Sequence, residues 1–390
     1  MRRVRLKEFG TFYSGLSGKS KSDFSEGNAL LVTYRNIFNN PVLNPAIKDT
    51  VVVGKDEKQN EVLWGDILIT GSSETPADAG MSSVVLFNPQ EKMYLNSFCF
   101  GFRLNDMNEA LPSYIGHLLR STSIRAAISK TAFGVTRFNV NRMRFADIEI
   151  PLPPLNIQKD IVSILDSFTS LIDKMKQEVE MRKKQMEYYR EKLMAPQTNW
   201  KIKTLGEIGT FTRGNGLQKS DFRVKGFPCV HYGQIHTYYN TCIYKTKSFC
   251  EEDLAKKLQK ASYGDLLIAT TSEDVKACCK AAVWFGAGDV AYSGDSFCYS
   301  HDQDPKYMAY LFQTEMFAKQ KQKAATGAKV IRVSGESMAS FSFAFPPLVQ
   351  QRQIASILDT FEIYISKLEK MIELRQKQYE YYREKLLTFE

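Results

Sequence analysis

The heptapeptide Glu-Tyr-Tyr-Arg-Glu-Lys-Leu occurs twice in this chain, at residues 187–193 and again at residues 380–386. The two copies end longer segments, residues 153–193 and 346–386, which align along their whole length without a gap. Such a match is typical of a continuous helix, because loops tolerate insertions more readily than regular elements do. The repeat therefore predicts two similar long helices, one in the middle of the chain and one at its end.

Apolar residues in both segments recur every three or four positions, as in helices that pack together along one seam. Each segment begins with a Pro-Pro pair, which suits a helix start. Each helix is therefore predicted to span about 38 residues, roughly 57 Å. Arg182 and Arg375 interrupt the seam at equivalent positions and must pair or reach solvent. The predicted seam includes Ile161, Ile164, Phe168, Met175 and Tyr189 in the first helix and Ile354, Ile357, Phe361, Leu368 and Tyr382 in the second.

The segments that precede the two helices resemble each other more weakly. LKEFGTF at 6–12 is similar to LGEIGTF at 205–211, WGDILIT at 64–70 to YGDLLIA at 263–269, and SFC at 97–99 to SFC at 296–298. Short β-type runs separated by Gly, Asn, Asp and Ser predict mainly β domains, with helices such as those at 112–130 and 305–323.

We therefore predict an α+β chain with a pseudo-two-fold internal repeat, in which two mainly β domains alternate with two long helices. The length of 390 residues fits this division, since single cores stop growing beyond roughly 250–300 residues. The predicted boundaries are 1–152 for the first domain, 153–198 for the first helical spacer, 199–345 for the second domain and 346–390 for the second spacer.

The composition favours an intracellular protein with a polyanionic partner. The net charge is +9, and most of the excess lies at residues 1–150, with 18 basic and 15 acidic groups, and at 200–343, with 19 and 14. No apolar run is long enough for a membrane span, and the basic start lacks the apolar core of a signal peptide. Seven cysteines without a CxxC pair favour buried thiols in a reducing cytoplasm over disulfides or a zinc site.

No catalytic or metal-binding constellation is recognisable in the sequence. GxxxxGK[ST] and GxGxxG phosphate-binding loops are absent, as is the Asn/Asp-Pro-Pro-aromatic motif of amino-methyltransferases. His231 and His236 are five residues apart near a predicted strand, which fits neither HExxH nor a triad. Asp66 and Asp265, each after a glycine, are better explained as turn residues at the start of a strand than as catalytic groups.

The remaining polar residues suit binding. Lys19, Lys21, Arg213 and Lys219 are predicted in Gly/Ser/Asn-rich loops, where they could contact phosphates. Arg35-Asn36 and Tyr232 to His236 are predicted at strand ends, and Arg, Asn and Gln can pair with base edges in a major groove. For any one of them a solvated loop residue is the simpler explanation. Tyr189 and Tyr382 continue the seam, whereas Tyr188 and Tyr381 face elsewhere and could contact a partner protein.

Taken together, these features resemble the specificity subunit of type I restriction-modification enzymes. Two divergent globular domains alternate with two near-identical helices, and each helix segment contains Pro-Pro-Leu, a Gln and an Ile-Leu-Asp motif, at Pro153–Asp166 and Pro346–Asp359. The family motif has an acidic residue before that Gln, where this chain has Ile157 and Gln350.

The resemblance implies two target-recognition domains that each read half of a bipartite, asymmetric DNA site, separated by two antiparallel helices. It also implies that this chain has no catalytic site, metal or cofactor of its own. Two modification subunits would use S-adenosylmethionine to methylate adenine, and two restriction subunits could add ATP- and Mg²⁺-dependent cleavage. The expected DNA contacts are Lys19, Lys21, Arg35, Asn36, Thr70, Ser72, Ser73, Arg137 and Asn139 in the first domain, and Arg213, Lys219, Tyr232, Gln234, His236, Thr271, Ser272, Lys329 and Arg332 in the second.

Two other hypotheses remain open at this point. One is a non-catalytic coiled-coil scaffold whose basic domains bind protein or RNA, without preference for a duplex sequence. The other is a fragment of a fused restriction enzyme that methylates in cis, which the missing cofactor motif disfavours.

Overall fold

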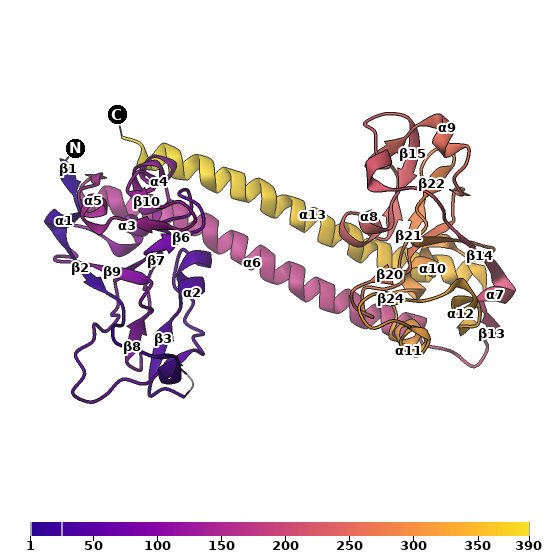
Figure 1. Ribbon diagram of the computed structural model, residues 1–390, viewed down its shortest axis with the longest axis horizontal. Coiled ribbons are helices and arrows are strands. Elements are labelled where there is room, and N and C mark those ends of the chain that lie inside the picture. Colours follow the sequence, from indigo (N-terminus) through magenta and orange to yellow (C-terminus); the bar gives the residue numbers. More distant parts are fainter. Residues whose placement is uncertain (1, 25, 390) are drawn as a thin grey trace. The chain divides into compact units, whose positions relative to one another are not determined.

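The computed structural model describes residues 2–24 and 26–389 (Figure 1). Its two longest helices are α6 (Leu155–Met194) and α13 (Leu348–Leu387), each of 40 residues. Contacts divide the chain into two compact units: unit 1 runs to Lys176 and resumes at Lys370, and unit 2 runs from Gln177 to Glu369. Each unit therefore contains segments of both helices. We call the part of the chain before α6 the first head and the part between α6 and α13 the second head.

The first head contains several small sheets. β1 (Arg2–Arg5) pairs with β12 (Glu149–Leu152), and the main sheet is antiparallel, with the order β2 (Gly10–Ser14), β9 (Cys99–Leu104), β5 (Ile67–Thr70), β7 (Ser82–Val84). Two further sheets have three strands each. One has the order β4 (Thr50–Val51), β3 (Ala29–Val32), β8 (Met93–Leu95), and the other has the order β10 (Ala132–Phe133), β11 (Phe138–Val140), β6 (Ser72–Ser73). Its short helices are α1 (Leu6–Phe9), η1 (Lys21–Phe24), α2 (Tyr34–Asn39), α3 (Pro112–Leu119), α4 (Thr122–Ser129) and α5 (Arg142–Ala146).

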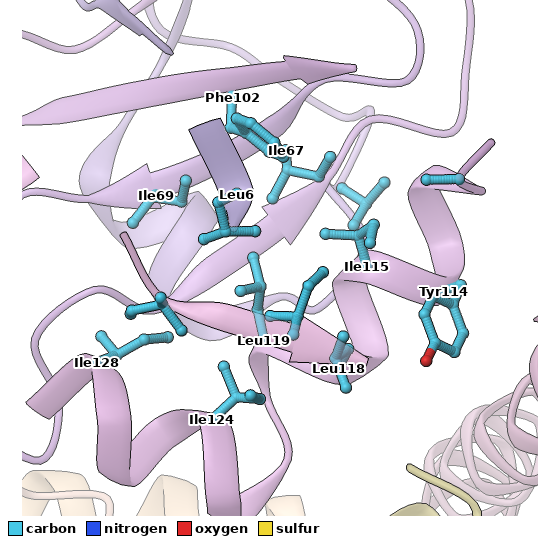
Figure 2. Close-up of a cluster of buried hydrophobic side chains, with 14 of the residues drawn as sticks. Leu6, Ile67, Ile69, Phe102, Tyr114, Ile115, Leu118, Leu119, Ile124 and Ile128 are labelled. Atoms are coloured by element: carbon cyan, nitrogen blue, oxygen red, sulfur yellow. The ribbon is translucent and has the colours of Figure 1, made fainter. Parts of the chain in front are cut away.

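The core of the first head lies between the main sheet and the helices α3 and α4. Figure 2 shows Ile67, Ile69 and Phe102 of the sheet directed toward side chains of α3 such as Ile115 and Leu119, all of which are fully buried. The same cluster continues into both long helices, where it includes Ile161, Leu165, Ile172, Tyr379 and Leu387. The long helices therefore complete this core, because their apolar faces are part of it.

The second head repeats this plan, with five strands in its main sheet where the first head has four. β13 (Lys201–Thr204) pairs with β25 (Ser342–Phe345), and the main sheet has the order β14 (Gly209–Arg213), β23 (Ser296–His301), β19 (Leu266–Ala269), β21 (Lys280–Trp284), β16 (Cys242–Ile243). A further sheet has the order β17 (Ser248–Cys250), β15 (Phe227–Val230), β22 (Val290–Tyr292), β18 (Lys260–Ala261). β20 (Thr271–Ser272) pairs with β24 (Ile331–Arg332) in a sheet of two strands. Its short helices are α7 (Leu205–Ile208), η2 (Lys219–Asp221), α8 (Tyr232–Thr237), α9 (Glu252–Ala255), α10 (Pro305–Leu311), α11 (Glu315–Ala324) and α12 (Gly335–Ala339).

The prediction of one helix at 112–130 and one at 305–323 was wrong, because each is a pair of helices. Ser121 and Thr314 have extended backbone and start the second helix of each pair, and the Thr314 side chain accepts a hydrogen bond from Phe317 N. Local capping of this kind ends one helix and starts another without a break in the apolar pattern.

The predicted equivalence of the two Ser-Phe-Cys segments was also wrong. β9 places Phe102 opposite Phe12 and Ile67, whereas β23 places Tyr299 opposite Phe211 and Leu266. Cys99 therefore corresponds to Ser296 and not to Cys298. A shift by two residues keeps every side chain on the same face of a strand, so the alternation of apolar residues could not reveal it.

The two main sheets are packed differently at one matching position. In the first head Tyr13 lies opposite Gly101, and a Cβ on Gly101 would lie 2.0 Å from Cζ of Tyr13. The Tyr13 hydroxyl donates to buried Asp66, which also accepts two hydrogen bonds from Arg103. In the second head Thr212 lies opposite Cys298 at this position. The first sheet thus has a large side chain opposite a glycine, and the second has two of intermediate size.

Asp66 and Asp265 form the predicted turns at the starts of β5 and β19. Each accepts a hydrogen bond from a backbone N–H three residues earlier, that of Leu63 or Ser262, at 2.8 Å. The preceding glycines have φ of +85° and +94°, which favour glycine. This interpretation of the Gly-Asp pairs is confirmed.

A buried glutamine fixes the start of each long helix. Gln158 donates to the carbonyls of Glu109 and Pro153 and accepts from Leu111 N, with distances of 2.8–2.9 Å. Gln351 donates to Pro346 O and to the Gln303 side chain and accepts from Asp304 N. Both amides are fully buried, so these bonds join the loop before α3 or α10 to the helix. The residue before Gln158, Ile157, is 39% exposed and takes no part in this network.

The aspartates of the Ile-Leu-Asp motif contact the heads about two turns of helix further on. Asp166 lies 2.7 Å from Nε2 of His117, whose Nδ1 lies 3.1 Å from the hydroxyl of Tyr379. Asp359 accepts a hydrogen bond from the hydroxyl of Tyr310 at 2.8 Å and pairs with Lys306. The same motif therefore contacts a different side chain in each head.

The long helices run antiparallel. In unit 2, Arg182 lies over Tyr364, and Tyr189, further along α6, stacks on Phe361, which is earlier in α13. In unit 1, Phe168 stacks on Tyr382 with ring centroids 5.4 Å apart. The predicted α+β fold, with an internal repeat and antiparallel helices, is thus present.

The seam departs from the prediction at two equivalent positions. Ile164 and Ile357 are 42% and 45% exposed, whereas the next residues, Leu165 and Leu358, are fully buried. The buried position is therefore one residue later in each helix than we predicted. The interrupting arginines are paired as expected: Arg182 with Glu178 and Gln185, and Arg375 with Gln378.

The repeated heptapeptide binds a head at each occurrence. In unit 1, both carboxylate oxygens of Glu384 accept hydrogen bonds from Thr122 N at the start of α4, at 2.9 and 3.0 Å. In unit 2, Glu191 accepts two equivalent bonds from Glu315 N at the start of α11. A free backbone N–H at a helix start is a favourable partner for a carboxylate. The repetition of this heptapeptide is explained by its docking on the same element in both heads.

Within the described ranges, no helix combines the length and apolar character that crossing a membrane requires.

Replacing Gln351 with leucine is expected to lower the free energy of unfolding of unit 2 by about 2–4 kcal/mol, because it leaves buried partners on Asp304, Pro346 and Gln303 unsatisfied. The free energy is measured by urea denaturation. The matched control is Gln353→Leu, at an exposed position of the same helix, with an expected effect within about 0.5 kcal/mol. Equal effects of both variants would contradict the role of the buried amide.

Candidate nucleic-acid interface

In the first head, a hairpin and a neighbouring strand bring three predicted contact residues together. Pairing of β11 with β6 places Asn139 opposite Ser72, and the hairpin turn that ends at Arg137 requires Gly134, whose φ is +133°. The Arg137 guanidinium lies 5.3 Å from the ring centroid of Phe98, and its Nε donates to Ser72 Oγ at 3.2 Å. Phe98 is 58% exposed, so Arg137 is held on an aromatic surface with its charge toward solvent.

A second arginine, Arg142 at the start of α5, completes this surface. Its guanidinium lies 5.1 Å from the Phe100 ring centroid and donates to Ser14 Oγ at 2.7 Å. Partial burial lowers the pKa of Arg142. Sequence comparison missed this residue because the matching position in the second head, after the capping Ser334, is Gly335. We call Ser72, Phe98, Arg137, Asn139 and Arg142 the first polar surface; Ser72 is only 4% exposed and serves as the buried hydrogen-bond partner of Arg137.

The other predicted residues of the first head have structural partners. Thr70 is fully buried and its hydroxyl accepts from Met81 N, and Ser73 is also buried. Arg35 and Asn36 lie within the helix α2 and not at a strand end, because Thr33 caps that helix. The Asn36 side chain accepts from Asn44 N and donates to Asn44 O, which uses both ends of its amide.

Lys19 and Lys21 differ in their surroundings. Lys19 Nζ lies 2.5 Å from Glu57, and its side chain is only 9% exposed. The hydrogen bond from Lys19, with further bonds from Gln59 and Gly54 N, lowers the pKa of Glu57 to about 2. Lys21 is exposed at the start of η1. Of the two lysines, Lys21 is therefore the one available to a phosphate.

In the second head, a larger set of predicted residues is connected. Pairing of β20 with β24 places Thr271 opposite Arg332, and Nε2 of His236 lies 2.9 Å from Thr271 O. The rings of His236 and Tyr232 are 6.3 Å apart. Arg332 is exposed, as is Lys329 in the turn that precedes it. We call Tyr232, His236, Thr271, Ser272 and Arg332 the second polar surface; Thr271 itself is buried and holds His236 through its carbonyl.

A cavity of about 380 Å³ adjoins this surface and is lined by Arg213, His231, Tyr232 and Asp295, among others. Arg213 is the last residue of β14, where its Nε donates to Gly294 O at 3.1 Å. Burial and the nearby charge of Lys219 lower the pKa of His231, whose Nδ1 accepts from Gly233 N at the start of α8. His231 therefore caps this helix as a neutral ring.

The prediction that residues 232–236 lie at a strand end was wrong, because they form α8. Gln234 is held within the second head: it accepts from His231 N and donates to Ser248 Oγ at 2.7 Å. Lys219 is exposed at the start of η2. These placements leave the DNA contacts themselves as predictions.

Among the described residues, no group of three or more His, Cys, Asp or Glu side chains is placed to hold a metal ion.

A family model described as the type I restriction modification DNA specificity domain matches residues 1–181 and again residues 197–376. This chain belongs to that family. The two matches cover both heads and most of both long helices, in agreement with the internal repeat.

Two curated relatives are similar over part of their length. A putative type I restriction enzyme specificity subunit of Haemophilus influenzae is 30% identical over 272 residues, which cover 66% of this chain and 68% of that protein. The EcoR124I/EcoR124II specificity subunit of Escherichia coli is 27% identical over 256 residues, which cover 62% and 63%. The match thus spans about two thirds of these relatives.

Two solved structures share the fold. The specificity subunit of a type I restriction-modification system from M. genitalium matches with a TM-score of 0.56 and 14% identity, over 100% of this chain and 96% of that one. A chain described under complex assembly and conformational transition of the type I R-M system matches with a TM-score of 0.60 and 14% identity, over 99% and 97%. At this identity the likeness is one of fold.

Replacement of Lys19 with alanine is expected to raise the pKa of Glu57 from about 2 toward its ordinary value of 4.5. In the native protein the ion pair stabilises the fold above pH about 4.5 and is lost as the pH falls through about 2. Titration of ¹³C-labelled glutamate carboxyl groups by NMR measures this. Lys21→Ala is the matched control and should leave that pKa unchanged; an equal rise in both variants would show that Lys19 has no special partner.

Proposed function

We propose that this chain is the DNA-reading subunit of a type I restriction-modification complex, with each head reading one half of a bipartite, asymmetric site. The observation that carries the proposal is that the two heads share one arrangement of sheets and helices but differ in the first and second polar surfaces. Equivalent hairpins present Arg137 beside Phe98 in the first head and Arg332 beside Thr271 in the second. Arginine on a hairpin can pair bidentately with a guanine edge in the major groove, so different surroundings favour different half-sites.

We further propose that the outer faces of the long helices recruit two modification subunits. Exposed apolar residues recur at repeat-equivalent positions with nearly equal exposure: Ile164 and Ile357 at 42% and 45%, Leu171 and Tyr364 at 41% and 43%, Tyr188 and Tyr381 at 60% and 61%. A lysine lies over each exposed tyrosine ring, Lys192 at 5.7 Å and Lys385 at 5.9 Å. Two equivalent surfaces fit two copies of the same partner.

In this proposal the chain itself is non-catalytic and acts in the cytoplasm. S-adenosylmethionine belongs to the modification subunits, and ATP and Mg²⁺ to restriction subunits where these are present. Residues 1–152 and 199–345 are then the reading units, and 153–198 and 346–390 set the distance between half-sites and bind partners.

Methylation mapping of the host genome by single-molecule sequencing, with and without this gene, tests the proposal. Loss of adenine methylation at one split motif on deletion would identify both half-sites at once. Re-expression of the gene must restore it. An unchanged methylome despite an expressed modification subunit would overturn the proposal in favour of a scaffold that binds protein or RNA.

Substitution of Arg137 with alanine is expected to weaken binding of the complex to the mapped site by about 1–3 kcal/mol and to relax the sequence preference in one half-site only. Arg332→Ala should relax the other half. Fluorescence anisotropy with duplexes that carry single base changes measures both effects. Arg5→Ala removes an equal charge at the β1–β12 pair, where Arg5 lies near Glu149, and should leave both preferences intact. Relaxation of both half-sites by either hairpin variant would contradict the assignment of one half to each head.

A further inference from the structure

Two adjacent thiols are buried at the end of the turn that connects β20 to β21. Cys278 and Cys279 are 0% and 1% exposed, and their sulfur atoms lie 3.9 Å apart. Cys278 Sγ donates to Thr270 O at 3.1 Å, and Cys279 Sγ lies 4.0 Å from Sδ of Met338. Both are free thiols.

The backbone at Cys279 is unusual for this residue type. Its φ is +62°, and within residues 2–24 and 26–389 it is the one non-glycine residue with positive φ. The first head has Gly80 at the matching place, with φ of +69°, after Ala79. A side chain in this conformation is strained, and the strain is borne at a residue with a reactive group.

The same turn is held by a basic side chain in both heads. Arg125 donates to the carbonyls of Ala77, Ala79 and Gly80. In the second head, buried Lys321 donates to the carbonyls of Lys276 and Cys278 at 2.9 and 2.8 Å. The matching function of the two basic residues shows that the cysteines are a change in an otherwise equivalent turn.

The two thiols differ in acidity. The Cys279 thiol, followed by the charge of Lys321, lowers the pKa of Cys278, whereas the pKa of Cys279 is raised well above its usual range by Cys278 and by burial. Burial raises the pKa of each of the other five cysteines. Of the adjacent pair, Cys278 is therefore the thiol that ionises first.

A cavity adjoins the two buried thiols. Cys278, Cys279 and Lys321 line a cavity of about 490 Å³, together with Arg190 and Glu187 of α6. The basic side chains favour an anionic species such as a thiolate or a leaving hydroxide next to the cavity wall.

We propose that Cys278 and Cys279 form a modification site at which hydrogen peroxide produces a reversible disulfide between the two adjacent residues. The Cys278 thiolate attacks one peroxide oxygen, which breaks the O–O bond, forms the sulfenic acid and releases hydroxide. The Cys279 sulfur then attacks the sulfur of Cys278, forms the S–S bond and expels the second oxygen as water. Two thiols lose two electrons in total, and one peroxide is reduced to two waters.

Disulfide formation also changes the second polar surface. Cys278 Sγ must leave Thr270 O, the carbonyl just before β20, in order to approach Cys279. β20 pairs with β24 and supports Arg332. This consequence rests on the proposed function: oxidation is expected to weaken reading by the second head and to leave the first head unchanged.

The full-length protein treated with hydrogen peroxide, denatured in iodoacetamide and digested with trypsin tests the site. Trypsin releases Ala277–Lys280, which contains both cysteines and no other. The expected product is this peptide without alkylation and lighter by two hydrogens than the dithiol, and dithiothreitol should restore two alkylated cysteines. Two alkylated cysteines at a peroxide concentration that oxidises free glutathione completely would overturn the proposal, as would irreversible oxygen addition.

The first head supplies matched controls. Cys279→Gly and Cys278→Ala each copy the residue at the matching position, so both variants are expected to fold, as measured by circular dichroism. Neither should form the disulfide. A disulfide at Cys278 in the Cys279→Gly variant, formed with another cysteine, would contradict the assigned pair.

Binding to the duplex mapped in the methylation experiment tests the consequence separately. Oxidation should weaken it by roughly tenfold, which corresponds to the loss of one base contact. The Cys279→Gly variant should bind equally with and without peroxide. If the disulfide forms but DNA binding is unchanged, the modification site stands and its link to DNA reading is overturned. If neither the reduced nor the oxidised protein binds the duplex, the result counts against the proposed function and not against the modification site.

Discussion

A carboxylate at the start of a helix joins each head to the helix pair. Glu384 binds the N-terminus of α4, and Glu191 binds that of α11, where first-turn N–H groups lack partners within the helix. In unit 1 this contact connects the last helix of the chain to its first head. The first head is therefore complete only when the end of α13 is in place, and its core, which includes Tyr379 and Leu387, has the same requirement.

The residues that dock the heads are distinct from those that form the polar surfaces. Gln158 binds three backbone groups, and Gln351 binds two backbone groups and the side chain of Gln303. Backbone groups are present whatever the side chains of a head are. Where the helices meet side chains, the partners differ: Asp166 meets His117, and Asp359 meets Tyr310. A framework that relies mainly on backbone groups places few demands on the sequence of a head, so the polar surfaces are free to diverge.

The sequence predicted the fold where the period of apolar residues and an exact repeat coincide. The long helices, their pairing and the Gly-Asp turns follow from such local patterns. The prediction of the helix seam was wrong at Ile164 because the next residue, Leu165, is also apolar, and the period of apolar residues does not distinguish between two adjacent ones. Helix α2 was predicted as a strand end because its start depends on one capping threonine, Thr33, within an apolar run.

The candidate interface was less predictable. Arg137 and Arg332 were found because both follow a turn that the two heads share. Arg142 was missed because only the first head has it, and a comparison of repeats reveals what is common. Lys19 was expected to be free, but its partner Glu57 lies in another loop, and no pattern in a single sequence shows that contact.

The opposed Tyr13 and Gly101 have a consequence for how such heads can evolve. A side chain at position 101 would collide with the tyrosine ring, and loss of the ring would leave Asp66 without one of its donors. Neither residue can change first without a penalty, although Thr212 and Cys298 show that the same strand pair accommodates another combination. Conversion of one residue pair into the other by single substitutions passes through less stable proteins, so stepwise point mutation is an unfavourable route between them. Exchange of a whole head avoids these less stable proteins, because both residues of the pair are then replaced at the same time.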